Sequence, residues 1–137
     1  MQNEKQETTT DITFRKLICN ENRTVRTQEI EKNNPSWDMV EDCLWNMFED
    51  DNEFVVLTVS NACDNIRYVQ AAQFTHGIIV QLGIEEGNNT RLVEKPCTEN
   101  QCRDIFHEFY QSSHVQNVEE YQPELSHRGL LPRQRSL

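Results

Sequence analysis

The sequence predicts an α+β protein in which an antiparallel β-meander sheet is covered on one face by two helices. Several short runs rich in β-branched residues are separated by polar turns, which is the pattern of consecutive antiparallel strands. Two other segments repeat apolar residues at three- and four-residue spacing, which is the pattern of helices with one buried face. Together these observations predict the element order β-β-α-β-β-β-β-α, with the helices packed on one side of the sheet.

The length of 137 residues fits one folded domain. Residues 1–10 are polar and lack an apolar anchor, so we expect a disordered N-terminus. The domain is expected over residues 11–125, followed by a mobile basic tail over residues 126–137.

The first two strands are expected to form a hairpin. Ile12–Cys19 is an apolar run, residues 20–22 have turn chemistry, and Val25–Ile30 is a second, weaker strand. Asn34 is then expected to cap the first helix, with Pro35 at its first position. The apolar stripe of this helix consists of Trp37, Val40, Leu44, Met47 and Phe48.

Four further strands precede the second helix. Phe54–Val59 is almost continuously apolar, which predicts a central strand buried on both faces. The strands Ile66–Phe74, Ile78–Ile84 and Thr90–Glu94 follow, with turns at residues 75–77 and 85–89. Along Ile66–Phe74, alternation places Ile66 and Tyr68 on the same face of the sheet.

The second helix begins with a capping box, in which Thr98 and Gln101 satisfy each other's backbone N–H groups. Its apolar stripe is Cys102, Ile105, Phe106, Phe109 and Tyr110. Val115, Val118, Tyr121 and Leu125 are expected to anchor a strap across the body of the domain.

One acidic segment accounts for most of the formal net charge of −10, because residues 38–53 carry seven carboxylates and neither lysine nor arginine. A concentrated negative face suits a basic partner, although a solvated helix has the same composition. Trp45 is offset from the apolar stripe, and an exposed tryptophan among carboxylates is typical of an interface hot spot. The predicted partner-binding residues are Asp38, Glu41, Asp42, Trp45, Glu49, Asp50 and Asp51.

Catalytic and metal-binding patterns are weak in this sequence. Cys102 and His107 lie on one helix but point about 140° apart, so a nucleophile–base pair is not expected and Cys102 is interpreted as a buried thiol. Cys97, Cys102 and His107 lack the spacing of a zinc site, and residues 50–53 lack the spacing and central glycine of an EF-hand. His76 is interpreted as an exposed turn residue. We therefore expect no cofactor, no metal and no enzymatic activity.

Composition also bounds the environment and the partners. The five cysteines are scattered and odd in number, which favours reduced thiols in a cytoplasm over a disulfide scaffold. A sequence pI near 4.8 disfavours nucleic acid as a partner. No secretory signal or membrane span is expected.

Residues 14–121 resemble bacterial immunity proteins of the Imm type, small cytoplasmic α+β proteins encoded beside polymorphic or contact-dependent toxins. The resemblance rests on the segment 34–37 opening a helix, the strand Phe54–Val59, the segments YVQAA (68–72) and GIIV (77–80), and a last helix that ends in Phe109-Tyr110. Such families often have a tryptophan near the end, where this chain has Tyr121.

The resemblance implies that the protein binds and neutralises a cognate protein toxin. Many such toxins are nucleases with basic substrate grooves, which an acidic helix could occupy as a phosphate mimic. Two alternatives remain open at this point. A cytoplasmic secretion chaperone would be a dimer with an apolar groove, and a small enzyme would need a convergent catalytic set that the sequence does not show.

Overall fold

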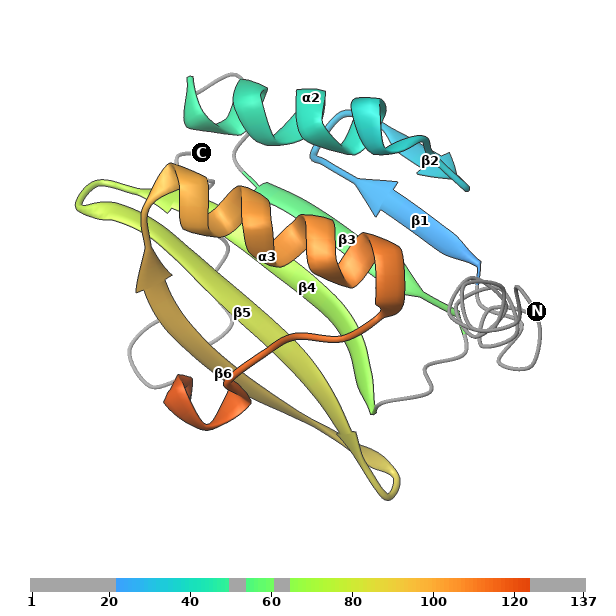
Figure 1. The fold of residues 1–137 in the computed structure, drawn as a ribbon, viewed down its shortest axis with the longest axis vertical. Coiled ribbons are helices and arrows are strands. Elements are labelled where there is room, and N and C mark those ends of the chain that lie inside the picture. The colour runs from blue at the N-terminus through green and yellow to red at the C-terminus, as the bar shows by residue number, and fades with distance from the viewer. Residues whose placement is uncertain (1–21, 50–53, 61–64, 124–137) are drawn as a thin grey trace, which may run out of the picture.

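A seven-stranded antiparallel sheet carries two helices on one face in the computed structural model, which describes residues 22–49, 54–60 and 65–123 (Figure 1). This arrangement confirms the predicted α+β class. The strands are β1 (Arg23–Arg26), β2 (Glu31–Asn33), β3 (Phe54–Val59), β4 (Ile66–Phe74), β5 (Gly77–Glu86), β6 (Asn89–Cys97) and β7 (Gln122–Pro123). The helices are α2 (Trp37–Phe48) and α3 (Glu99–Ser112), and a 3₁₀ turn, η1 (Val118–Glu120), follows α3.

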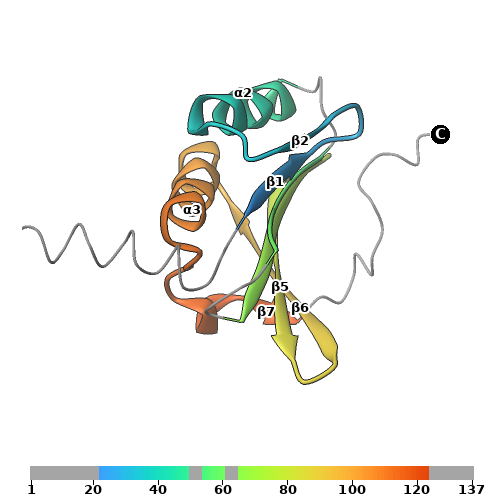
Figure 2. The same ribbon diagram turned by 90° about the vertical axis from the view of Figure 1, so that its right-hand side faces the viewer.

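The strands lie in the order β2-β1-β3-β4-β5-β6-β7. The strands β3 to β6 form the predicted meander, in which each strand pairs with the next in the chain. The strand β3 also pairs with β1 and not with β2. After the edge strand β2, the chain therefore crosses through α2 to β3, which lies on the other side of β1. Figure 2 shows that α2 and α3 lie on the same side of the sheet.

The first hairpin differs from the sequence prediction. The strand predicted at Val25–Ile30 is wrong, because β1 ends at Arg26 and residues 27–30 form the turn that leads into β2. The hydroxyl of Thr27 stabilises this turn by accepting hydrogen bonds from the backbone N–H groups of Glu29 and Ile30, at 3.1 and 3.2 Å. The strand predicted at Ile12–Cys19 lies outside the described residues.

The start of α2 also differs from the prediction, because Ser36 is the N-cap and Trp37 is the first helical residue. The Ser36 hydroxyl accepts a hydrogen bond from the N–H of Met39 at 3.1 Å. Asn34 has a left-handed conformation with φ of 51°, which asparagine tolerates well. Its N–H donates to the carbonyl of Arg23 at 2.6 Å, so Asn34 closes the end of the hairpin and does not cap the helix.

The main hydrophobic core lies between the helices and the sheet. Phe106 and Phe109 of α3 and Leu44 and Met47 of α2 are fully buried there. They pack on the helix-facing side chains of the central strands, among them Val55, Leu57, Val59, Val69, Ala71, Val80 and Leu82. This core confirms both predicted apolar stripes. Because the stripes face the sheet, the opposite faces of α2 and α3 are turned toward solvent.

The opposite face of the sheet carries a second, smaller apolar cluster. Phe54, Val56 and Ala72 are buried in it, so β3 is buried on both faces as predicted. The Tyr68 ring covers Gly83 so closely that a Cβ atom at residue 83 would lie 2.4 Å from it. A bulge between Ile66 and Tyr68 turns Ile66 into the main core, so the prediction that these two residues share a face is wrong.

Candidate functional site

The outer face of α2 carries an acidic stripe with one tryptophan in it. Asp38, Asp42, Trp45 and Glu49 are all exposed, and their spacing of four, three and four residues places them along one side of the helix. Trp45 is 39% exposed, as the sequence predicted, and its ring meets the Phe48 ring edge-on at 5.1 Å between centroids. We call these four residues the α2 stripe. The other predicted acids, Asp50 and Asp51, lie outside the described residues.

Phe48 fixes the orientation of the Trp45 ring. The two ring planes are 86° apart, and Phe48 is itself packed against the main core. Edge-to-face pairs of this kind contribute about 0.5–1.5 kcal/mol beyond the burial of their area. The contact with Phe48 therefore restricts the exposed Trp45 side chain, which lowers the conformational entropy that it would lose on contact with a partner.

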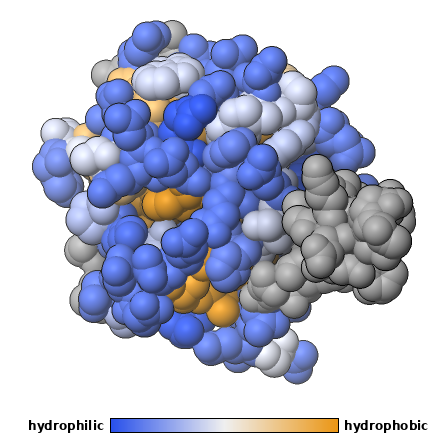
Figure 3. Space-filling view, in the orientation of Figure 1, coloured by the Kyte–Doolittle hydropathy of each residue, from blue (hydrophilic) through white to orange (hydrophobic). Residues whose placement is uncertain are grey.

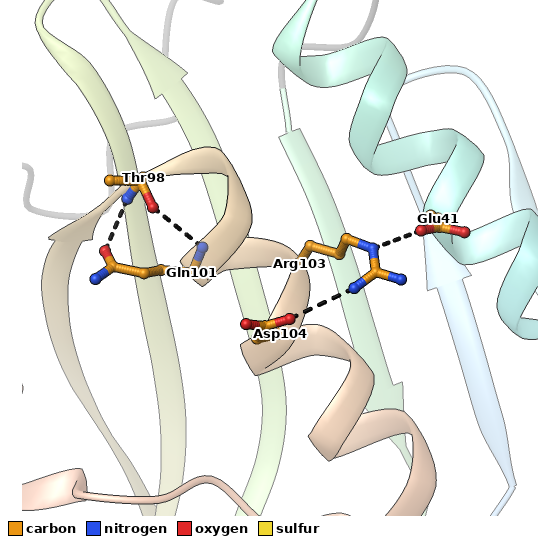
Figure 4. Close-up of polar contacts among 5 residues, drawn as sticks. All are labelled: Glu41, Thr98, Gln101, Arg103 and Asp104. Atoms are coloured by element: carbon orange, nitrogen blue, oxygen red, sulfur yellow. Dashed lines mark hydrogen bonds and ion pairs between the residues drawn. The ribbon is translucent and has the colours of Figure 1, made fainter.

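Glu41 was predicted to belong to the acidic face, but it makes an internal ion pair. Its carboxylate accepts a hydrogen bond from Nε of Arg103 on α3 at 2.5 Å, as Figure 4 shows. The same guanidinium lies 3.4 Å from the Asp104 carboxylate and 5.8 Å from the Trp37 ring centroid. Half-exposed pairs contribute at most about 1 kcal/mol. Glu41 therefore links the two helices, and its charge is already compensated.

Aromatic contacts complete the junction of the two helices. Trp37 packs against His107 at 4.6 Å and against Tyr110 at 5.7 Å between ring centroids, so its predicted structural role is confirmed. The Tyr110 hydroxyl donates a hydrogen bond to the carbonyl of Pro35 at 2.8 Å. Cys102 lies instead on the core side of α3, fully buried, which confirms that it and His107 face different surroundings.

The acidity extends beyond α2 to the whole helical layer. Residues 37–49 and 98–123 carry nine carboxylates and a single basic side chain of the lysine or arginine type, Arg103. The seven strands carry six such basic residues and four carboxylates. Figure 3, which views the helical side, shows a mostly hydrophilic surface with small apolar patches. The acids outside the first helix are Glu99, Asp104, Glu108, Glu119 and Glu120.

The local sequence pattern does not reveal this second part of the acidic surface. The charges on residues 99–120 were visible in the sequence, but their neighbours include apolar core positions that dilute the local pattern. Only the fold brings α3 beside α2 on one side of the sheet (Figure 1).

A shallow groove of about 340 Å³ lies between α3, η1 and β6. Asp104, Glu108 and Asn117 are among the polar residues that line it. Lys95, also in the lining, is paired with Glu120 at 3.2 Å and lies 4.8 Å from the centroid of the Tyr121 ring. The groove therefore continues the acidic surface and offers no uncompensated cation.

Two further structural findings concern metal binding and membrane crossing by the described residues. Nowhere in residues 22–49, 54–60 and 65–123 do three His, Cys, Asp or Glu side chains gather in a way that could hold a metal ion. Within the same ranges, neither helix has the length and apolar character that crossing a bilayer requires.

Comparisons with protein-family models, with curated proteins and with solved structures gave no match to this chain.

Proposed function

We propose that this protein is an immunity protein, which binds and neutralises a basic protein toxin through the α2 stripe. The observation that carries the proposal is Trp45, a large apolar side chain that is 39% exposed between exposed carboxylates on the same side of one helix. The resemblance of residues 14–121 to Imm-type proteins supplies the toxin as the partner class.

The chemistry of the stripe supports a protein partner. Buried tryptophans are among the residues that contribute most to protein interfaces, and charged residues around them exclude water and select the partner. Asp38, Asp42 and Glu49 form no ion pair with any residue in the described part of the chain. Their charges are therefore available to a basic surface.

The rest of the helical layer supports the same proposal through its long-range field. Nine carboxylates against one arginine on one side of a small domain attract a basic protein before contact. Such steering raises the association rate and weakens with added salt, whereas the tryptophan anchor mainly slows dissociation. The nuclease toxins implied by the resemblance have basic grooves that this layer would match in charge.

The experiment compares single charge reversals at two exposed carboxylates that form no ion pair within the described part of the chain. Asp42→Lys changes the α2 stripe, and Glu119→Lys makes the same change in net charge on η1. Each immobilised variant is used to capture proteins from the organism that produces it, at low and at high salt. We expect one basic protein to bind the unmodified chain and Glu119→Lys stoichiometrically, and to bind Asp42→Lys much more weakly.

Trp45→Ala is the second variant in this experiment. We expect it to weaken capture by a factor of about 30 or more, which corresponds to the roughly 2 kcal/mol of a hot spot. Co-expression of the captured protein with and without this chain then tests neutralisation of its toxicity. Equal capture by Asp42→Lys, Trp45→Ala and the unmodified chain would exclude the α2 stripe as the binding site. A captured protein that is not toxic would exclude the immunity function.

A further inference from the structure

A second exposed apolar side chain lies at the turn of the β1–β2 hairpin. In the part of the chain that the structure describes, the large hydrophobic residues that are exposed are Trp45, at 39%, and Ile30, at 41%. Ile30 belongs to neither of the two apolar clusters of the domain. The strand that follows it, β2, is fully exposed and contains no apolar residue. Folding therefore gains little from an isoleucine at this position.

The turn holds Ile30 by its backbone. The N–H of Ile30 donates to the Thr27 hydroxyl at 3.2 Å, and its carbonyl accepts from the Thr27 N–H at 2.9 Å. Thr27 is itself buried, so the exposed isoleucine is attached to a fixed point of the fold. The contact with Phe48 restricts Trp45 in a similar way. Both side chains therefore lose less conformational entropy on contact with a partner than residues of a loose loop would.

Carboxylates flank Ile30 as they flank Trp45. Glu29 and Glu31 are its neighbours in the chain, and both are exposed. Neither forms an ion pair with any described residue, the hairpin cations Arg26 and Lys32 included. The turn therefore repeats the combination found in the α2 stripe, an exposed apolar side chain beside carboxylates that are available to a partner.

The fold brings this turn close to the C-terminal end of α2, which carries Trp45. Arg26, the last residue of β1, pairs with Val56 of β3, and its guanidinium carbon lies 5.6 Å from the centroid of the Phe54 ring. Phe54 follows Glu49 by five residues, which span at most about 18 Å. Both views of the ribbon show the turn beside α2 (Figure 1, Figure 2). A protein interface buries about 800 Å² on each partner, which is wide enough to include both positions.

We propose that Ile30 is a second apolar anchor for the basic protein that binds the α2 stripe. This inference rests on the proposed function and extends the binding surface from α2 to the β1–β2 turn. The partner then carries two apolar recesses in a basic surface, one for Trp45 and one for Ile30. Two separate anchors also fix the orientation of the bound partner, which a single tryptophan on a helix does not.

The experiment measures the affinity of Ile30→Ser for the basic protein that the unmodified chain captures. The substitution removes the apolar side chain and leaves the net charge unchanged. We expect the dissociation constant to rise about three- to tenfold, the factor that burial of the exposed part of an isoleucine gives, mainly through faster dissociation. We expect the midpoint of urea denaturation to stay unchanged, because Ile30 belongs to neither apolar cluster.

Leu92→Ser is the matched control. Leucine and isoleucine are isomers, so the two variants lose the same atoms, and Leu92 is a partly exposed residue of β6 outside both apolar clusters. The strand β6 lies four strands from β1, or about 19 Å across the sheet. We expect Leu92→Ser to bind as tightly as the unmodified chain. Combining Ile30→Ser with Trp45→Ala should multiply their separate effects on the dissociation constant, because distant contacts add in free energy.

The outcomes separate this inference from the proposed function. Weak binding by Asp42→Lys and Trp45→Ala together with full binding by Ile30→Ser would overturn the second anchor and leave the α2 stripe as the binding site. Equal weakening by Ile30→Ser and Leu92→Ser would also overturn it, because the effect would not be specific to the turn. If the unmodified chain captures no basic protein, both the second anchor and the proposed function are overturned.

Discussion

Arg23 provides a positive charge that the last turn of α3 lacks in its own sequence, and its removal is the sharpest test of the fold. The last turn of α3 contains no basic residue, although the carbonyl groups at a helix C-terminus carry partial negative charge. Arg23 of β1 lies beside this end of the helix. Its Nε donates to the carbonyl of Tyr110 at 2.7 Å, and its guanidinium also donates to the Ser113 hydroxyl at 2.8 Å.

The contacts of Arg23 set the magnitude of the effect. Arg23→Met keeps most of the apolar stem of a residue that is only 8% exposed and removes both hydrogen bonds. Hydrogen bonds to charged groups contribute about 1.5–3 kcal/mol each. Removal of a buried charge returns part of this loss, because its desolvation no longer opposes folding. We therefore expect the free energy of unfolding to fall by about 2–4 kcal/mol.

Arg26 is the matched control, because it lies on the same strand but on the opposite face of the sheet. It is exposed, and its guanidinium carbon lies 5.6 Å from the centroid of the Phe54 ring. A contact of this kind contributes about 0.5–1 kcal/mol at an exposed site. The assay is urea denaturation followed by tryptophan fluorescence, with hydrogen exchange of the α3 amides. The reasoning is refuted if Arg23→Met destabilises the protein no more than Arg26→Met does.

Two further predictions concern tyrosines. Tyr110→Phe should lower the free energy of unfolding by about 1 kcal/mol, because it removes the hydrogen bond to Pro35. Tyr121→Phe should leave it unchanged or raise it by about 1 kcal/mol, because it removes a buried hydroxyl that has no hydrogen-bond partner among the described residues. Urea denaturation distinguishes the two, and equal losses would contradict the burial argument. Gly83→Ala should destabilise by about 1–3 kcal/mol, because its Cβ would overlap the Tyr68 ring. The loss should shrink in a Tyr68→Ala background, and additive losses in that double-mutant cycle would contradict the contact.

The sequence predicted the elements whose signals are long and local. The apolar run Phe54–Val59, the strands and turns of residues 66–97 and the Thr98 capping box each need only neighbouring residues to form, and all were found. The bulge between Ile66 and Tyr68 is the one departure, because it interrupts the predicted alternation. The first hairpin was misplaced because Thr27 can serve a strand or a turn equally well. Which state wins depends on the pairing of β1 with β3, which local residues do not specify.

The N-cap of α2 was predicted two residues too early for the same reason, because distant contacts decide its position. Asn34 and Ser36 are both good N-cap residues, and the sequence offered no reason to prefer the second. The choice depends on the distant Arg23, whose backbone pairs with Asn34 and holds it in the hairpin. The local sequence does not indicate the role of Arg23, because its partners Tyr110 and Ser113 lie some ninety residues away along the chain.

The candidate site was predicted in part for similar reasons. The exposure of Asp38, Asp42, Trp45 and Glu49 follows from helical periodicity, which the sequence contains. The ion pair of Glu41 with Arg103 forms only when α2 packs against α3, so no local sequence pattern predicts it. The residues of α3 that extend the acidic surface needed the same packing to be recognised.

The distribution of charge is difficult to explain by folding alone. Asp38 and Asp42 are like charges four residues apart on α2, and Asp104 and Glu108 repeat this spacing on α3. Each such pair disfavours its helix by about 0.2–0.5 kcal/mol. The one arginine of this layer pairs with Glu41 and leaves the stripe uncompensated.

The Asp42→Lys variant separates folding from binding for this reason. It replaces a repulsive pair with Asp38 by an attractive one, so the free energy of unfolding should stay equal or rise by a few tenths of a kcal/mol. If the same variant loses its partner, the carboxylate is kept at a cost to helix stability and for the sake of binding. A variant that is both less stable and still able to bind would show instead that Asp42 has a structural role, and the acidic surface would need no partner to explain it.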